Sequence, residues 1–255
     1  MKRILVTNDD GIDSEGIKAL AESLQTIGNV VVVAPSSDMT AVSHSITLNR
    51  PLKIDEVAPN RYSVEGTPTD CVVLAINLVM KDSPPDLVVS GINKGANLGD
   101  DVHYSGTVAG AVEATMYKIP AIAVSLAGRN SYDFTEAAKL ARLVAEKVLS
   151  EGLPKGTFLN VNLPRSPIKG VVVTRQGTKI ARTNLIETKD PRKRSYYWIG
   201  GDYTHWEQEK GTDIDAVRRG YASITPLKND MTNNSHLSAL QSWDSNWLAA
   251  DSVDF

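Results

Sequence analysis

The chain has 255 residues, of which 42% are apolar, and its 27 basic and 30 acidic residues give a formal net charge of −3. This length and composition allow one or two globular domains with a substantial core. The nearly balanced charge argues against a protein that binds a nucleic-acid duplex or a membrane surface by electrostatics. The single cysteine, Cys71, excludes an internal disulfide and a cysteine-rich zinc site.

The first predicted strand begins at Arg3, which leaves no room for a signal peptide in this sequence. No apolar stretch approaches the ~18 residues that a membrane span requires. We therefore expect a cytoplasmic protein with no membrane partner.

Short β-branched runs alternate with amphipathic segments over the first 150 residues or so, and this alternation predicts parallel βαβ units with helices on both sheet faces. In chain order, the predicted elements are strand 4–6, helix 17–24, strand 30–34, helix 68–80, strand 87–90, helix 107–117, strand 121–125 and helix 133–150. Gly28 is expected to end the first helix in a left-handed conformation. Thr67, Pro68 and Asp70 form the N-terminal signature of the second helix.

The alternation changes after about residue 153, where predicted strands 157–162, 171–175 and 196–199 have few helices between them. The segment from 177 to 193 is polar and weakly patterned. A final helix is predicted around Leu237, Leu240, Trp243, Trp247 and Leu248, whose apolar face indicates core or subunit contact. We therefore divide one domain into a core of about 1–153 and an extension of about 154–255 that packs on the core or reaches another subunit.

Two adjacent carboxylates, Asp9 and Asp10, follow the first strand at the point where the chain turns. Neighbouring carboxylates repel each other unless a cation or strong donors neutralise them, and hard divalent cations take oxygen ligands of this kind. Asn, Asp and Gly also favour any strand-to-loop turn. The pair alone therefore fits a metal site and an ordinary turn about equally well.

Other polar segments follow the remaining strands, where ligands of open α/β sheets bind. A loop rich in hydroxyl groups contains Thr40 and Ser43, and the glycine-rich loop 91–101 contains Asn93 and Asn97. The helix that begins near Ser105 offers unpaired N–H groups to an anion, to which Ser105, Gly106 and Thr107 contribute. Ser105 equally suits the simple role of capping its own helix, and the asparagines equally suit positive φ angles.

Together, Asp9, Asp10, a hydroxyl near Thr40 and Asn93 would form an all-oxygen site suited to Mg²⁺, Mn²⁺ or Ca²⁺. Such a cation, with donors at a helix start, suits phosphate chemistry.

The motifs in these loops resemble those of the SurE family of survival-protein nucleotidases. Five ordered blocks carry the resemblance: Thr7-Asn8-Asp9-Asp10-Gly11, Gly66-Thr67-Pro68-Thr69-Asp70-Cys71, Val89-Ser90-Gly91-Ile92-Asn93, Asn97-Leu98-Gly99-Asp100-Asp101 and Tyr104-Ser105-Gly106-Thr107. A later segment, 220–227, resembles a further family motif. Five blocks in order are far more specific than any one of them.

The resemblance implies a Rossmann-like three-layer α/β/α sandwich whose C-terminal extension exchanges elements between subunits, which gives a homodimer or homotetramer. It also implies a divalent-metal-dependent phosphomonoesterase that hydrolyses nucleoside 5′- and 3′-monophosphates. One Mg²⁺ or Mn²⁺ per subunit is expected, with Ca²⁺ as a substitute in crystals.

The family's metal ligands fall on Asp9, Asp10, Thr40 and Asn93. Thr40 stands where the family usually has serine, and Ser43 is the nearest substitute ligand. In the mechanism that this implies, a metal-activated water attacks phosphorus in line, with Asp9 or Asp10 as general base. The substrate phosphate is assigned to Asn8, Asn97, Ser105, Gly106 and Thr107. The leaving-group acid is left unassigned, with His44 and His103 as weak candidates.

Other classes lack their own signatures. The sequence has no Gly-x-Gly-x-x-Gly after the first strand, no Gly-Lys-Ser/Thr triplet and no Gly-x-Ser-x-Gly. A signalling receiver domain would also carry an acidic pair, but its phosphoacceptor aspartate and its late lysine are missing. A non-catalytic module that senses or scaffolds metal and nucleotide remains the alternative.

Overall fold

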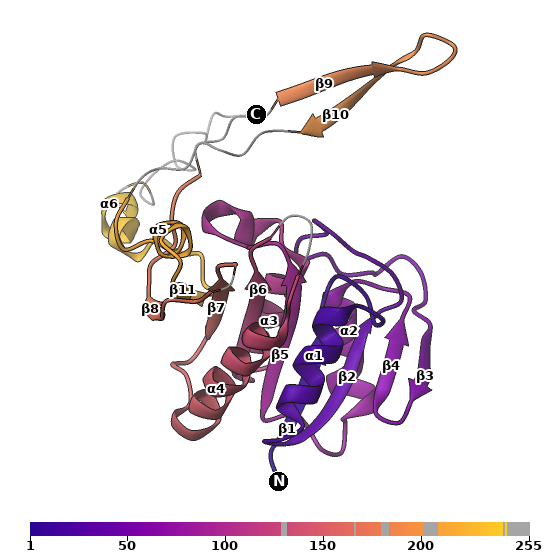
Figure 1. Ribbon diagram of the computed structural model, residues 1–255, viewed down its shortest axis with the longest axis vertical. Coiled ribbons are helices and arrows are strands. Elements are labelled where there is room, and N and C mark those ends of the chain that lie inside the picture. The colour runs from indigo at the N-terminus through magenta and orange to yellow at the C-terminus, as the bar shows by residue number, and fades with distance from the viewer. Residues whose placement is uncertain (129–131, 166, 180–183, 201–208, 242, 244–255) are drawn as a thin grey trace, which may run out of the picture.

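The computed structural model describes residues 1–128, 132–165, 167–179, 184–200, 209–241 and 243. In this part of the chain, a mixed and mostly parallel sheet of nine strands runs through the molecule, with helices on both of its faces (Figure 1). The α/β fold predicted from the alternating pattern is therefore confirmed.

The strand order in the sheet is β3-β4-β2-β1-β5-β6-β7-β11-β8. Neighbouring strands are parallel, except that β3 is antiparallel to β4 and β11 is antiparallel to β7. The strands are β1 Arg3–Thr7, β2 Asn29–Pro35, β3 Ile54–Ala58, β4 Arg61–Val64, β5 Leu87–Lys94, β6 Ala121–Leu126, β7 Thr157–Leu163, β8 Val171–Val173 and β11 Ala222–Lys228.

Two helices cover each face of the sheet. Helices α1, Glu15–Leu24, and α4, Thr135–Glu151, pack on one face. Helices α2, Pro68–Leu74, and α3, Gly106–Met116, pack on the other, and α2 continues as a wider turn over Ala75–Val79. Each pair buries its apolar side against the β-branched residues of the strands, which creates two cores on either side of one sheet.

Local signals correctly positioned most helix starts. The predicted capping box is present, with the Thr67 hydroxyl accepting from the Asp70 N–H and the Asp70 carboxylate accepting from the Thr67 N–H. The prediction for Gly28 was wrong. Helix α1 ends with Gln25 as its cap, and a Cβ on Gly28 would lie 2.7 Å from the Lys2 carbonyl oxygen. Close packing against the β1 segment, and not a left-handed cap, requires glycine there.

The order of the strands creates a switch point beside β1. From β1 the chain crosses to β2 on one side, while β5 pairs with β1 on the other side. The loops after β1 and β5 therefore diverge and leave a crevice at the carboxyl ends of the strands, which is where open α/β sheets bind ligands. The predicted acidic ligands lie on the loop after β1, and the predicted amide ligand lies at the end of β5.

The C-terminal part of the chain first extends the same sheet and then leaves it. Strands β7, β11 and β8 continue the sheet, and the short helix α5, Asp213–Arg218, precedes β11. Strands β9, Asn184–Lys189, and β10, Ser195–Gly200, form a separate antiparallel hairpin that projects from the body (Figure 1). The polar pattern of 177–193 gave no prediction of β9.

The final predicted helix is only partly within the described residues. Helix α6 spans Leu237–Gln241, and its Leu237 and Leu240 are 47% and 45% exposed. Trp247 and Leu248 lie outside the described residues.

Candidate metal and phosphate site

Asp9 and Asp10 lie in the turn that follows β1, at the switch point of the sheet. Asp9 is only 5% exposed, and Asp10 is half-buried. Burial raises the pKa of Asp9 to about 6, and the neighbouring charge of Asp10 adds to the rise. Partial burial also raises the pKa of Asp10. The two neighbouring carboxyls thus resist ionisation, and a bound cation would stabilise their charged forms.

The N-terminus of α3 lies directly against Asp9. The Thr107 hydroxyl donates a hydrogen bond to Asp9 Oδ1 at 2.5 Å, and this bond lowers the pKa of Asp9 against the effect of burial. A Cβ on Gly106 would lie 2.8 Å from the Asp9 Cβ and 3.1 Å from its Oδ2. Glycine therefore lets the start of α3 approach the carboxylate, which brings helix N–H groups beside the acidic pair.

Asn8 supports this turn from within. Its Nδ2 donates to the Gly11 carbonyl at 3.0 Å and to Ser14 Oγ at 2.8 Å, while its Oδ1 is buried with no hydrogen-bond partner among the described residues. Ser14 in turn caps α1 by accepting from the Ile17 N–H. Both amide N–H groups of Asn8 are thus used to fix the turn that holds Asp9 and Asp10 in place.

The end of β5 brings Asn93 and Lys94 to the acidic pair. The Lys94 N–H donates to Asp10 Oδ2 at 3.2 Å. The Asn93 Nδ2 donates to the Gly95 carbonyl at 2.9 Å, which leaves its side-chain oxygen as the group suited to a cation. An irregularity in the β5–β6 register between Ser90 and Asn93 changes the direction of these residues relative to the strand.

The loop after β2 closes over the same turn. The Met39 N–H donates to the Asp9 carbonyl at 2.8 Å. The Thr40 hydroxyl and N–H both donate to Asp38 Oδ1, whose charge adds to the raised pKa of Asp10. The Ser43 hydroxyl donates to the His103 carbonyl at 2.7 Å. Asp38 was missed by the sequence analysis, although an acid in a hydroxyl-rich loop after a strand was a usable signal.

Two of the predicted phosphate ligands have structural partners of their own. Ser105 caps α3, because its hydroxyl accepts from the Val108 N–H at 3.0 Å. The Asn97 Nδ2 donates to Ser125 Oγ at 2.8 Å, and the Asn97 N–H donates to Asn162 Oδ1 at 2.7 Å. Their buried positions are therefore set by hydrogen bonds within the protein.

The two histidines differ in their surroundings. His44 Nε2 lies 2.8 Å from Oε2 of Glu113, which is on α3 two turns beyond its N-terminus. This contact holds the imidazole against the middle of α3. His103 is in the turn of 3-10 helix Gly99–His103 and is exposed.

A cavity of about 560 Å³ adjoins the start of α3. Its lining includes polar groups of Ser43, His44 and Ser105 and apolar groups such as Val112 and Phe158. This size and mixed lining are typical of small-molecule sites.

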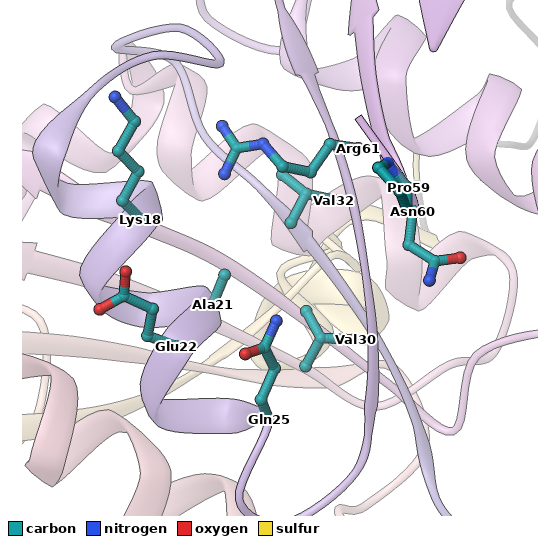
Figure 2. Close-up of a pocket in the computed structure, with 9 residues that line it drawn as sticks. All are labelled: Lys18, Ala21, Glu22, Gln25, Val30, Val32, Pro59, Asn60 and Arg61. Carbon is teal, nitrogen blue, oxygen red and sulfur yellow. The ribbon is translucent and has the colours of Figure 1, made fainter. Parts of the chain in front are cut away.

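A second cavity, of about 300 Å³, lies between α1 and the β2–β4 edge and contains none of the predicted site residues (Figure 2). In it Ala21 of α1 lies toward Val30 and Val32 of β2, while Arg61 donates from Nη2 to the Ile12 carbonyl at 2.7 Å. The Arg61 guanidinium is thus hydrogen-bonded to the main chain of the turn before α1.

Comparison with known proteins gives a consistent result. A family model described as "Survival protein SurE" matches residues 4–183. The 5′-nucleotidase SurE of Geobacter sulfurreducens is 51% identical over 246 residues, which cover 94% of this chain and 93% of that protein. The 5′-nucleotidase SurE of Vibrio parahaemolyticus is 48% identical over 244 residues, with 94% of each chain covered.

Solved structures agree. The crystal structure of the SurE protein from Aquifex aeolicus matches with a TM-score of 0.86 at 44% identity, covering 94% of this chain and 99% of that one. The five motif blocks that suggested the family lie in or beside the elements described above, and three of them border the acidic turn. The chain belongs to the SurE family of survival proteins.

Proposed function

We propose that this protein is a divalent-metal-dependent nucleotidase that hydrolyses nucleoside 5′- and 3′-monophosphates to nucleoside and phosphate. The observation that carries the proposal is the contact between the acidic turn and the start of α3, through Asp9, Gly106 and Thr107. This contact places groups that bind a cation beside groups that bind an anion, which is the arrangement that phosphate ester hydrolysis needs. Relatives of about 50% identity that are named 5′-nucleotidases support the same activity.

One Mg²⁺ or Mn²⁺ per subunit would be held by Asp9, Asp10, Thr40 and Asn93. The raised pKa values of the two carboxyls and the orientation of the Asn93 amide fit a hard cation. Such a cation supplies polarisation of a phosphoryl oxygen and a lower pKa for an attacking water. Asp9 or Asp10 would accept the proton from that water, since both carboxylates lie at the site.

The substrate phosphate is held by the N–H groups of Gly106 and Thr107, with Ser105 and Asn97 beside them. The first N–H groups of a helix lack partners within the helix and favour an anion. An amide nitrogen carries two N–H groups, so Asn97 keeps one for a phosphate oxygen after its bond to Ser125. Asn8 contributes indirectly by holding the acidic turn.

The cavity beside Ser105 is the proposed place for the nucleoside. Its lining includes Ser105 at the start of α3 together with apolar Val112 and Phe158. A nucleoside has a polar sugar and a flat base, so a cavity lined by both polar and apolar groups suits it.

We propose that the β9–β10 hairpin joins subunits into a homodimer or homotetramer by exchange of C-terminal elements. Both faces of the hairpin carry apolar side chains that are 51 to 77% exposed: Leu185, Ile186, Tyr196, Tyr197, Trp198 and Ile199. An exposed apolar surface of this kind marks a protein interface. Covering it with a second copy of the chain would complete the packing that a strand with two apolar faces requires.

We expect the protein to act in the cytoplasm. None of the helices in the described residues is long and apolar enough to cross a membrane. A nucleoside monophosphate dissolved in the cytoplasm would reach the site directly.

The decisive experiment measures phosphate release from AMP and from 3′-AMP by metal-stripped protein, with and without added Mn²⁺ or Mg²⁺. The Asp9→Asn variant is the control. Turnover that needs metal and disappears in the variant supports a phosphomonoesterase built on the acidic pair, and the ratio of the two rates measures 3′ against 5′ preference. Metal binding without turnover would favour a sensing or scaffolding module.

A further inference from the structure

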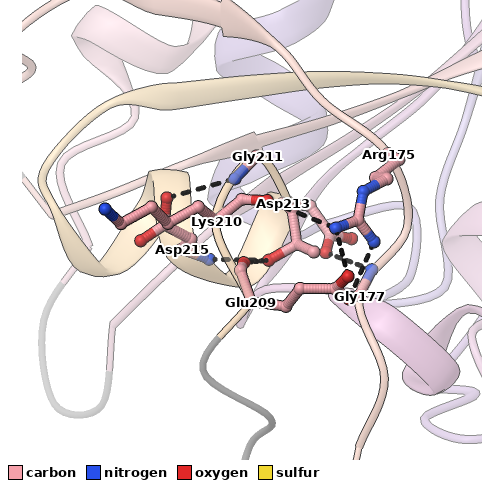
Figure 3. A network of polar contacts seen from close by, with 8 residues as sticks. Arg175, Gly177, Glu209, Lys210, Gly211, Asp213 and Asp215 are labelled. Atoms are coloured by element: carbon pink, nitrogen blue, oxygen red, sulfur yellow. Dashed lines mark hydrogen bonds and ion pairs between the residues drawn. The ribbon is translucent and has the colours of Figure 1, made fainter.

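The fully buried carboxylate of Asp213 connects three segments that are far apart in the sequence. Its Oδ1 accepts hydrogen bonds from the N–H groups of Gly177 and Ile214, both at 2.8 Å (Figure 3). Its Oδ2 accepts from the N–H of Gly99 at 2.9 Å. Gly99 lies two residues after Asn97, so Asp213 anchors the far end of the loop that we assign to the substrate phosphate.

The backbones around this carboxylate pack too closely for side chains. Gly99 has a φ of +53°, and a Cβ there would lie 2.9 Å from the Gly177 carbonyl oxygen. The Gln176 side chain adds a hydrogen bond from its Nε2 to the Gly99 carbonyl at 3.2 Å. The position of Gly99 is therefore fixed by the segment between β8 and β9 together with Asp213.

Strand β7 holds the near end of the same loop. Asn162 Oδ1 accepts from the Asn97 N–H, and Asn160 Nδ2 donates to the Asn97 carbonyl at 2.9 Å. The loop is thus held at Asn97 by two amide side chains and at Gly99 by one carboxylate. Only Leu98 lies between the two anchored residues, so a shift of Gly99 is passed to Asn97 through a single residue.

We propose that Asp213 is a positioning residue that sets the phosphate affinity of the active site by holding the loop of Asn97. This inference rests on the proposed function, because it assumes that Asn97 contacts the substrate phosphate. Asp213 does not touch the substrate in this proposal. Three of the proposed metal ligands, Asp9, Asp10 and Thr40, lie on other loops, and Asn93 lies in strand β5 before the anchored residues. Asp213 therefore affects phosphate binding more strongly than metal binding.

The Asp213→Asn variant removes one acceptor with little change in shape. If the oxygen of the introduced amide serves Gly177 and Ile214, its N–H groups face the N–H of Gly99, and two donors oppose each other. The opposite orientation of the amide would create two such conflicts. The variant therefore breaks the Gly99 bond selectively, which is the bond that the proposal requires.

The experiment compares wild type, Asp213→Asn and the matched control Asp215→Asn on the same helix, whose carboxylate makes long bonds of 3.4 Å to Gly211 and Arg219. Calorimetry gives the dissociation constants for inorganic phosphate and for Mn²⁺, and kinetics give KM and kcat for AMP. In Asp213→Asn we expect the phosphate constant and the KM to rise about tenfold. Mn²⁺ affinity stays within about twofold in both variants.

Unchanged phosphate affinity in Asp213→Asn would overturn the proposal, as would an equal loss of Mn²⁺ affinity or an equal effect of Asp215→Asn. Gln176→Ala is a milder second variant for the case in which Asp213→Asn does not fold, and it is expected to raise the phosphate constant about threefold. Wild-type turnover of AMP tests the proposed function by itself. Wild type that binds phosphate without turnover would remove that function, and the binding constants would still decide the role of Asp213.

Discussion

The Thr107 hydroxyl donates a 2.5 Å hydrogen bond to Asp9 Oδ1 and so joins two residues that are 98 positions apart in the sequence. This bond connects the turn after β1 to the first turn of α3. It places a carboxylate with a raised pKa beside a helix N-terminus, and most of the predictions below depend on that contact or on its neighbours.

The first prediction concerns the stability of the metal-free protein. Asp9 has a pKa of about 6 in the folded state and 3.8 in the unfolded chain, so the folded state binds the proton more tightly. The contribution of protonated Asp9 to the free energy of unfolding is therefore full below pH 3.8 and is lost as the pH rises through 6. The Asp9→Asn variant avoids this loss of stability, because its amide does not ionise. In EDTA we expect the variant to be more stable than wild type at pH 7, by about 3 kcal/mol.

Denaturant unfolding of both proteins at pH 4 and pH 7 measures this difference. The gain should be small at pH 4, where Asp9 is mostly protonated, and Mn²⁺ should stabilise only wild type at pH 7. An equal gain at both pH values would show that ionisation of Asp9 is not its source.

The second prediction concerns the Thr107 hydroxyl. Its hydrogen bond lowers the pKa of Asp9, so Thr107→Val should raise that pKa further and leave less carboxylate for a cation near neutral pH. We expect Mn²⁺ affinity at pH 6 to fall about tenfold in Thr107→Val and to remain near wild type in Thr107→Ser, which keeps the donor. Calorimetry at pH 6 and pH 8 checks this, because a pKa effect must be smaller at pH 8.

The third prediction identifies the hydroxyl ligand. Thr40 is adjacent to Met39, whose N–H donates to the Asp9 carbonyl, whereas Ser43 donates from its N–H to the Tyr104 carbonyl and from its hydroxyl to the His103 carbonyl. Thr40→Val should therefore weaken Mn²⁺ binding by about tenfold, and Ser43→Ala should change it by less than about twofold. Thr40→Ser is the control that keeps the hydroxyl. The reverse ranking of Thr40→Val and Ser43→Ala in a Mn²⁺ titration would assign the ligand to Ser43.

The fourth prediction tests the nucleoside cavity. Val112 lines it, and Met116, one turn further along α3, is 53% exposed and does not. Val112→Phe should fill part of the cavity and lower kcat/KM for AMP about tenfold, by the cost of overpacking. Hydrolysis of glycerol phosphate, which has no base, should change little. Met116→Phe is the matched control, and equal losses on both substrates would place the nucleoside elsewhere.

Local sequence patterns determined strands β1, β2, β5, β6 and β7, the helices between them and the capping box of Thr67 and Asp70, because these depend on residues within a few positions of one another. Strands β3, β4 and β11 were not predicted. The same patterns marked Asp9, Asp10 and Asn93 as residues at strand ends. Strand β9 was missed because it lies in a polar segment with no alternation that a local pattern detects.

Tertiary structure alone decided which strand ends meet. The order of β1, β2 and β5 in the sheet brings Asp38 and Lys94 to Asp10, and the packing of α3 brings Thr107 to Asp9. The carboxylate of Asp213 bonds to Gly99 across 114 positions in the sequence. Such contacts depend on burial and strand order, and no periodicity along the chain encodes them. The sequence therefore determined the kinds of groups at the site, and the fold determined their neighbours, their burial and their pKa values.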